Sequence, residues 1–216
     1  MYTADSGIVG DLYRRPASGA GEPELLVRSP LPKHANSWSP DRRYLIYDKH
    51  HPTRRQDLLL LALDGERKSR PLLVTNADET LAYFSPDGRW IVYSSDESGR
   101  AEIYVRDFAP ESTPAFGAQK WTISQKGGDK PRWSADGREI YYIGPEGMMM
   151  AVLIDNRAGM FKPGGAIALF QTNTNGYVPY DVTPDGRFLI NTAPDTTTQQ
   201  SIPVTVLVNW QSRLLR

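Results

Sequence analysis

Three histidines are the residues of this sequence best suited to metal binding or proton transfer: His34, His50 and His51. They do not form the His-Glu-x-x-His pattern that places two imidazoles on one face of a helix. In an extended segment, the adjacent His50 and His51 point to opposite sides and do not converge on one ion. We therefore interpret all three as ordinary solvated loop histidines and predict no metal site.

Sequence signatures of catalysis are missing as well. The sequence has no Gly-x-Ser-x-Gly elbow, no phosphate-binding glycine loop, no Gly-x-Gly-x-x-Gly and no His-Arg-Asp kinase signature. It has no cysteine, which excludes disulfides and thiolate metal sites. We expect no catalytic residue and no cofactor, so that any kinase or peptidase activity would belong to a different domain.

The charge balance argues against a polyanionic partner. Lys and Arg together number 25, as do Asp and Glu, so the 216-residue chain has no net field to attract nucleic acid or an anionic membrane. No apolar run approaches the roughly 20 residues that span a bilayer. The first ten residues also lack the basic and apolar regions of a signal peptide. We expect neither nucleic-acid binding nor direct membrane insertion by this chain.

A turn motif repeats four times along the chain and indicates the elements that hold the polar residues in place. The four copies are Ser39-Pro40-Asp41-Arg42-Arg43, Ser85-Pro86-Asp87-Gly88-Arg89, Ser134-Ala135-Asp136-Gly137-Arg138 and Thr183-Pro184-Asp185-Gly186-Arg187. Their aspartates are separated by 46, 49 and 49 residues, the period of four-stranded propeller blades. In such a turn, Pro presets φ, Asp accepts hydrogen bonds from nearby amides and Gly adopts a positive φ. We therefore assign structural roles to Asp41, Asp87, Gly88, Asp136, Gly137, Asp185 and Gly186.

The strand after each turn is apolar on both faces. In Trp90-Ile91-Val92-Tyr93, one face carries Trp90 and Val92 and the other carries Ile91 and Tyr93. A sheet with a hydrated face would alternate apolar and polar residues, so these sheets must be covered on both sides. Blades stacked around an axis provide that cover. The aromatic residues before the motifs, Trp38, Phe84 and Trp133, are expected to fill the gaps between blades.

The strand inventory predicts one all-β propeller domain over residues 1–216. Complete blades are expected at 34–78, 79–128 and 129–176, with partial blades at 1–33 and 177–216. Asp11-Leu12-Tyr13 has the pattern of a third strand, so the first blade lacks its inner strand, and Val204–Asn209 would be the third strand of the last. Two arrangements fit: an open arc cut from a larger propeller, which we favour, or a closed ring of five blades. The oligomeric state is left open.

The motifs resemble the WD40-like repeats of the TolB propeller family. The resemblance rests on Ser-Pro-Asp-Gly-Arg followed by Ile/Leu-x-Tyr, and on third strands such as Glu102-Ile103-Tyr104-Val105-Arg106-Asp107. Asp11–Pro16 and Val206–Trp210 more narrowly resemble propeller regions that follow the membrane segment of some bacterial serine/threonine protein kinases. This resemblance implies a periplasmic or other extracytoplasmic sensor or interaction module. Prolyl-oligopeptidase-like hydrolases carry similar propellers.

Loops from second to third strands and from fourth to first strands emerge on one face, because each strand reverses direction. That face is the expected partner-binding surface, and its charges of both signs suit a protein interface. The candidate residues are His50, His51, Arg54, Arg55, Asp96, Arg100, Lys126, Asp129 and Lys130. We expect a protein or peptide partner. Two alternatives are an accessory propeller of a hydrolase and a propeller that binds a small ligand or carbohydrate in its central channel.

Overall fold

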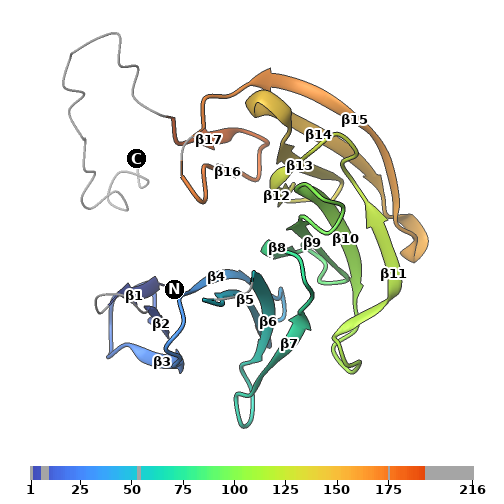
Figure 1. Ribbon diagram of the computed structural model, residues 1–216. Coiled ribbons are helices and arrows are strands. Elements are labelled where there is room, and N and C mark those ends of the chain that lie inside the picture. The colour runs from blue at the N-terminus through green and yellow to red at the C-terminus, as the bar shows by residue number, and fades with distance from the viewer. Residues whose placement is uncertain (1, 6–9, 53–54, 175, 193–216) are drawn as a thin grey trace, which may run out of the picture.

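The computed structural model describes residues 2–5, 10–52, 55–174 and 176–192, and it is built almost entirely of antiparallel strands. The strands form five sheets, called blades 1 to 5, which follow one another along an arc (Figure 1). Their strands are, for blade 1, β1 (Tyr2–Asp5), β2 (Gly10–Arg14) and β3 (Glu24–Val27); for blade 2, β4 (Lys33–Trp38), β5 (Tyr44–His50), β6 (Gln56–Ala62) and β7 (Ser69–Leu73); for blade 3, β8 (Glu79–Phe84), β9 (Trp90–Ser95), β10 (Glu102–Phe108) and β11 (Phe116–Thr122); for blade 4, β12 (Asp129–Trp133), β13 (Glu139–Ile143), β14 (Met148–Asp155) and β15 (Lys162–Gln171); and for blade 5, β16 (Tyr180–Val182) and β17 (Phe188–Ile190).

The predicted fold class, an all-β propeller of four-stranded antiparallel blades, is confirmed. Blades 2, 3 and 4 each have four strands in sequential order, blade 1 has three and blade 5 has two among the described residues. The inner strands β4, β8 and β12 line the inside of the arc, and β7, β11 and β15 lie on its outside (Figure 1). No described strand of blade 5 pairs with one of blade 1. The exact blade boundaries stay predictions, and Val204–Asn209 lies outside the described residues.

The outer strand of blade 3 includes a run of exposed residues. β11 starts at Phe116, and its residues 118–120 are exposed. Phe116 pairs with Phe108 across a register shift in β10 and is only 5% exposed. Burial of this aromatic ring against its neighbour extends the strand through residues whose side chains face solvent.

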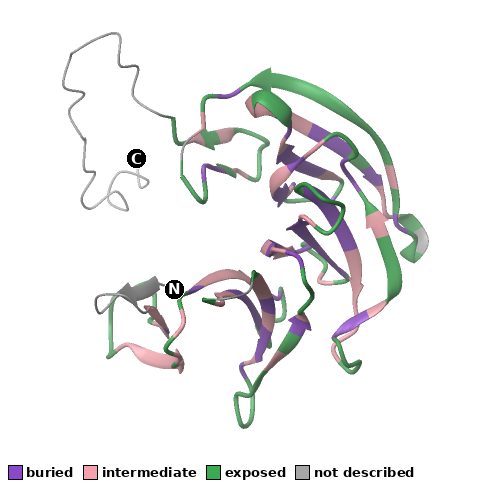
Figure 2. Cartoon of the chain, viewed as in Figure 1, coloured by how far each residue is buried: buried purple, intermediate pink, exposed green. Residues whose placement is uncertain are grey.

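The core lies between the blades. Ile91 and Tyr93 of β9 pack in a cluster shared with blade 2, whereas Trp90 and Val92 pack in a cluster shared with blade 4. The two faces of one strand therefore join two interfaces, and buried residues run through the middle strands of blades 2 to 4 (Figure 2). Phe84 belongs to the first of these clusters and Trp133 packs against the second.

The aspartates of the repeated turns accept hydrogen bonds locally. Asp41 Oδ1 accepts from Ser39 Oγ at 2.5 Å and from the Arg43 amide at 3.0 Å. The corresponding Ser/Thr hydroxyl donates to Asp87, Asp136 and Asp185 as well. Arg42 has φ = 62° where the other copies have glycine, with φ = 74°, 70° and 81° at Gly88, Gly137 and Gly186. These turns lie on the face opposite the predicted partner-binding loops. No helix among the described residues has the length and apolar character needed to cross a membrane.

Candidate binding site at the mouth of the propeller

The loops that follow the second strands meet the loops that precede the first strands on one face, here called the mouth. Arg55, which immediately precedes β6, forms ion pairs with Asp78, which precedes β8, and with Asp96, which follows β9. The Asp78 amide donates to Asp96 Oδ1 at 2.8 Å. This arrangement ties the mouth loops of blades 2 and 3 together.

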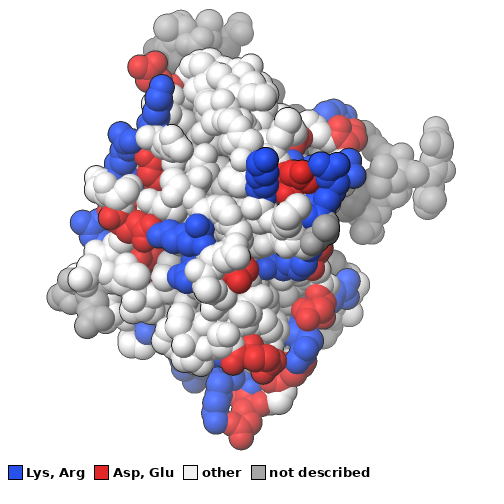
Figure 3. Space-filling model, turned by 90° about the vertical axis from the view of Figure 1, so that its right-hand side faces the viewer, with Lys and Arg blue, Asp and Glu red and all other residues white. Residues whose placement is uncertain are grey.

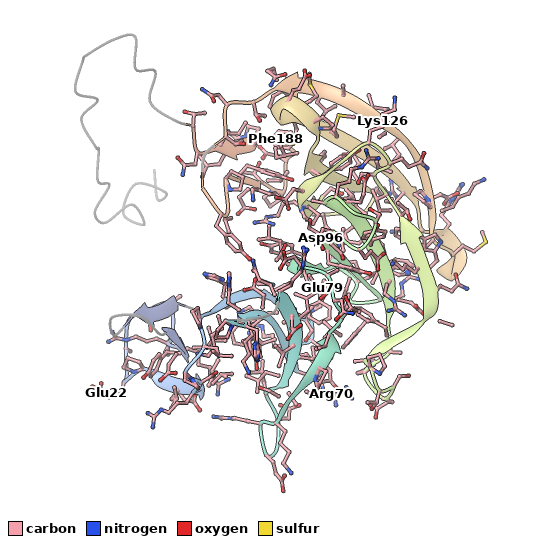
Figure 4. All side chains as sticks on the ribbon, in the orientation of Figure 1. Glu22, Arg70, Glu79, Asp96, Lys126 and Phe188 are labelled. Atoms are coloured by element: carbon pink, nitrogen blue, oxygen red, sulfur yellow. The ribbon has the colours of Figure 1, made fainter. Side chains whose placement is uncertain are left out.

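A pocket of about 380 Å³ opens at the mouth between blades 2, 3 and 4. Asp96 of blade 3 borders this pocket, and Figure 4 labels it together with Glu79 of the same blade. Residues lining the pocket include Asp78, Leu81, Asp96, Arg100, Asp129, Lys130 and Tyr177. Both charge signs therefore border one concave site, which suits recognition of a polar ligand or peptide.

Two residues of this pocket have a backbone conformation that is unfavourable for their side chains. Leu81 has φ = 53° and Lys130 has φ = 59°, and each lies three residues before the aromatic end of its inner strand. Both occur where the register of the inner strand shifts against the second strand. Left-handed non-glycine residues cost about 1–3 kcal/mol each and cluster at functional sites, and bulges beside such sites redirect side chains.

The paired strands β4 and β5 of blade 2 bring two histidines beside a buried carboxylate, with His34 on β4 and Asp48 and His50 on β5. Asp48, which has no exposed side-chain surface, accepts from Tyr177 Oη at 2.7 Å and lies 2.9 Å from His34 Nδ1. The hydrogen bond with Asp48 raises the pKa of His34 above its usual value. Burial, reinforced by the Asp48 charge, raises the pKa of Tyr177. The ring of His50 lies 5.3 Å from that of His34.

Blade 3 carries two buried glutamates at its mouth end, and their surroundings differ. Glu102 accepts from Arg100 Nε at 2.7 Å, from Ser124 Oγ and from the Gly127 amide at 2.9 Å. Glu79 accepts from Thr75 Oγ1 through one oxygen, and its Oε2 is buried without a hydrogen-bond partner. Burial raises the pKa of Glu79 to about 7.

The predicted partner-binding residues are only partly gathered at this pocket. Asp96, Arg100, Asp129 and Lys130 line it, and Arg55 contacts it through Asp96. Lys126 instead borders a separate pocket of about 470 Å³ between blades 3 and 4. Arg54 lies outside the described residues.

The interpretation of the histidines as solvated loop residues is wrong for His34 and His50, which lie within β4 and at the end of β5. His51 does lie in the loop after β5, but one ring nitrogen of His51, like one of His50, is buried without a hydrogen-bond partner. Strand pairing, which the histidine spacing alone does not reveal, places His34 and His50. Sequence reasoning also missed Asp48 and Tyr177. A carboxylate ending the apolar run of β5 is a signal for Asp48, but no local signal points to Tyr177.

Charges of both signs also intermingle on the outer side of the molecule. Figure 3 shows Lys and Arg side chains next to Asp and Glu side chains there, separated by uncharged surface. The view shows no extended surface of a single sign.

The radial series of four-stranded antiparallel blades defines this chain as a β-propeller. No family model and no curated protein sequence matches it. Among solved structures, TolB from Acinetobacter baumannii is similar to it, with a TM-score of 0.64 and 19% identity over 86% of this chain and 43% of that protein. A puromycin-hydrolyzing peptidase from Mycobacterium tuberculosis has a TM-score of 0.58 and 16% identity over 88% of this chain and 34% of the peptidase.

A periplasmic gluconolactonase from Pseudomonas aeruginosa is also similar, with a TM-score of 0.50 and 20% identity over 85% of this chain and 57% of that protein. The chain spans about half the length of the TolB structures it matches, 57% and 43% of them. At sequence identities this low, the structural similarity shows a shared fold alone. The narrower resemblance to kinase propeller regions finds no support in these comparisons.

The prediction that this chain is not an enzyme is overturned by the same comparisons. A peptidase and a gluconolactonase are among the proteins whose structures contain this fold. The prediction rested on missing sequence signatures. Catalytic groups are recognised by their spatial arrangement and come from distant positions, so a search for short motifs does not exclude an activity.

Proposed function

We propose that this propeller binds a polypeptide segment in its mouth pocket and serves as an interaction or sensor module of an envelope-associated protein. The observation that carries this proposal is the pair of strained residues, Leu81 and Lys130, which both line the pocket. A backbone held in an unfavourable conformation at corresponding positions of two neighbouring blades favours a functional role for this surface.

The chemistry of the pocket supports a peptide as the ligand. Lys130 and Arg100 supply cationic donors, and Asp96 and Asp129 supply acceptors, around a pocket of about 380 Å³. Tyr177 adds a partly exposed aromatic ring, and Lys130 Nζ lies 5.7 Å from the centre of that ring. A peptide backbone with polar side chains can satisfy such a mixture, with the aromatic ring as an apolar contact.

The proposed periplasmic or extracytoplasmic location rests on the resemblance of the repeats to the TolB family. We place the mouth face toward the partner because the opposite face consists of the short repeated turns. Those turns use their aspartates for local hydrogen bonds, as Asp87 does with Ser85 Oγ at 2.7 Å.

Selection from a random peptide library tests this proposal directly. Peptides enriched on the purified 216-residue chain would be labelled, and their dissociation constants measured by fluorescence anisotropy. Lys130→Gln should weaken binding about 10-fold, because one charge-assisted hydrogen bond contributes about 1.5 kcal/mol. Arg138→Gln is the matched control, since Arg138 is an exposed cation in the turn 134–138 on the opposite face.

The two variants distinguish binding at the mouth from binding at the opposite face. Weaker binding by Lys130→Gln with unchanged binding by Arg138→Gln supports the mouth as the binding site. Failure to enrich any peptide, or binding that depends on Arg138 and not on Lys130, overturns the proposal.

A further inference from the structure

The register of blade 2 brings three potential metal ligands together. In the antiparallel pair of β4 and β5, His34 lies directly opposite Asp48. His50 follows Asp48 by two residues, so both side chains project from the same face of β5. Two imidazoles and one carboxylate thus gather at the mouth end of one blade, although 16 residues separate His34 from His50.

The distances place these ligand atoms near one another. His34 Nδ1 lies 2.9 Å from Asp48 Oδ1, and one ligand atom from each of the three residues lies within 4.8 Å of the others. Zinc–nitrogen and zinc–oxygen distances of about 2.0–2.2 Å require ligand atoms no more than about 4 Å apart. The present spacing exceeds that limit by less than about 1 Å, so binding requires an adjustment of an imidazole ring.

Burial and missing hydrogen bonds give an independent reason to expect a ligand here. Asp48 has no exposed side-chain surface, and Nε2 of His50 is buried without a hydrogen-bond partner. A buried polar group without a hydrogen-bond partner destabilises the folded state. Coordination of an ion by His50, together with the turning of its ring, would remove this penalty.

Tyr177 supports the carboxylate from outside the cluster. Its hydroxyl donates to Asp48 Oδ2, and its ring packs 4.8 Å from the ring of His34. Metal-binding side chains commonly receive such hydrogen bonds, which fix their orientation. Asp48 Oδ2 is then held by Tyr177, and Oδ1 faces His34.

We propose that His34, Asp48 and His50 form a binding site for one divalent transition-metal ion of the zinc class. Imidazole and carboxylate ligands suit Zn²⁺, Co²⁺ and Ni²⁺, whereas Ca²⁺ and Mg²⁺ prefer sets of oxygen ligands. The ion takes the place of the proton between His34 and Asp48, and that proton is released to solvent. Three protein ligands leave a tetrahedral ion one further position, which water or a partner's group can occupy.

The test is a metal titration of the intact 216-residue chain after treatment with a chelator. Zn²⁺ binding would be measured by calorimetry, and Co²⁺ binding by its visible absorption, which reports the geometry of the ligands. The expected result is one ion per chain. Both His34→Gln and His50→Gln should lower the affinity by more than about 10-fold, a loss already seen when outer-shell partners of a metal are removed.

His51→Gln is the matched control, because it makes the same chemical change at the one histidine outside the cluster. Its affinity should equal that of the unaltered chain. Circular dichroism would establish that each variant is folded, and Asp48→Asn would replace any variant that is not. Absence of stoichiometric Zn²⁺ and Co²⁺ binding overturns the proposal, as does equal affinity in folded His34 and His50 variants. Loss of binding on His51→Gln also overturns it.

Discussion

Replacement of Glu79 by Gln should stabilise this propeller at alkaline pH. Glu79 is fully buried, and burial raises its pKa from 4.5 to about 7. One pKa unit corresponds to 1.36 kcal/mol, so ionised Glu79 costs the folded state at most about 3 kcal/mol. We expect a gain of about 1–3 kcal/mol from Glu79→Gln at pH 8, since Gln occupies the same space without a charge.

The pH dependence has a definite sign. Between about pH 4.5 and pH 7 the folded chain holds a proton on Glu79 that the unfolded chain has lost. Because the folded state binds more protons, the contribution of Glu79 to stability falls as the pH rises through this interval. Glu79→Gln should therefore match the unaltered chain near pH 4.5 and exceed it increasingly up to about pH 7.

Urea unfolding monitored by tryptophan fluorescence from pH 4.5 to pH 8.5 measures this difference. Glu102→Gln is the control, because Glu102 is also buried but accepts from Arg100, Ser124 and Gly127. That substitution removes charge-assisted hydrogen bonds and should destabilise the chain at pH 8. A difference between Glu79→Gln and the unaltered chain that stays constant across this range would refute the reasoning.

Three further substitutions test the turns and the contact between blades 1 and 2 by urea unfolding. Lys33→Met should lower the free energy of unfolding by about 2–4 kcal/mol, because buried Lys33 donates to the carbonyls of Gly10, Ser29 and Leu31. A decrease of less than about 1 kcal/mol would contradict this expectation. Arg42→Gly should stabilise by about 0.5–1 kcal/mol, because φ = 62° favours glycine, and a loss of stability would count against strain there. Gly88→Ala should destabilise by about 1–2 kcal/mol, since φ is 74° and the added Cβ would lie 3.3 Å from Pro40; an unchanged urea midpoint would show that this turn adapts.

The sequence determined the blade architecture because its signals are local. The turn motif repeats at the period of a blade, and strands such as Trp90–Tyr93 are apolar on both faces. Neighbouring side chains of one strand alternate between two sides, so this pattern alone requires a blade on each side. The structure places Ile91 and Val92 in different interfaces, as the pattern predicted.

The functional surface was only partly accessible from the sequence. Strand reversal predicted which loops share a face, and Asp96 and Lys130 indeed line one pocket. The same reasoning did not separate Lys126 from them, because the distance of a loop residue from the axis depends on how its blade packs against the next. The positive φ of Lys130 was equally invisible, because it arises at a register shift between paired strands.

Only the tertiary structure decided which polar groups meet. His34 reaches Asp48 because two strands pair in one register, and a shift of one residue would turn these side chains to opposite faces. Tyr177 reaches the same carboxylate across 129 residues because the segment that precedes β16 extends to blade 2. Composition and periodicity act over a few residues, whereas such contacts depend on the placement of whole blades. For that reason the blades were predictable from the sequence, and the cluster of His34, Asp48, His50 and Tyr177 was not.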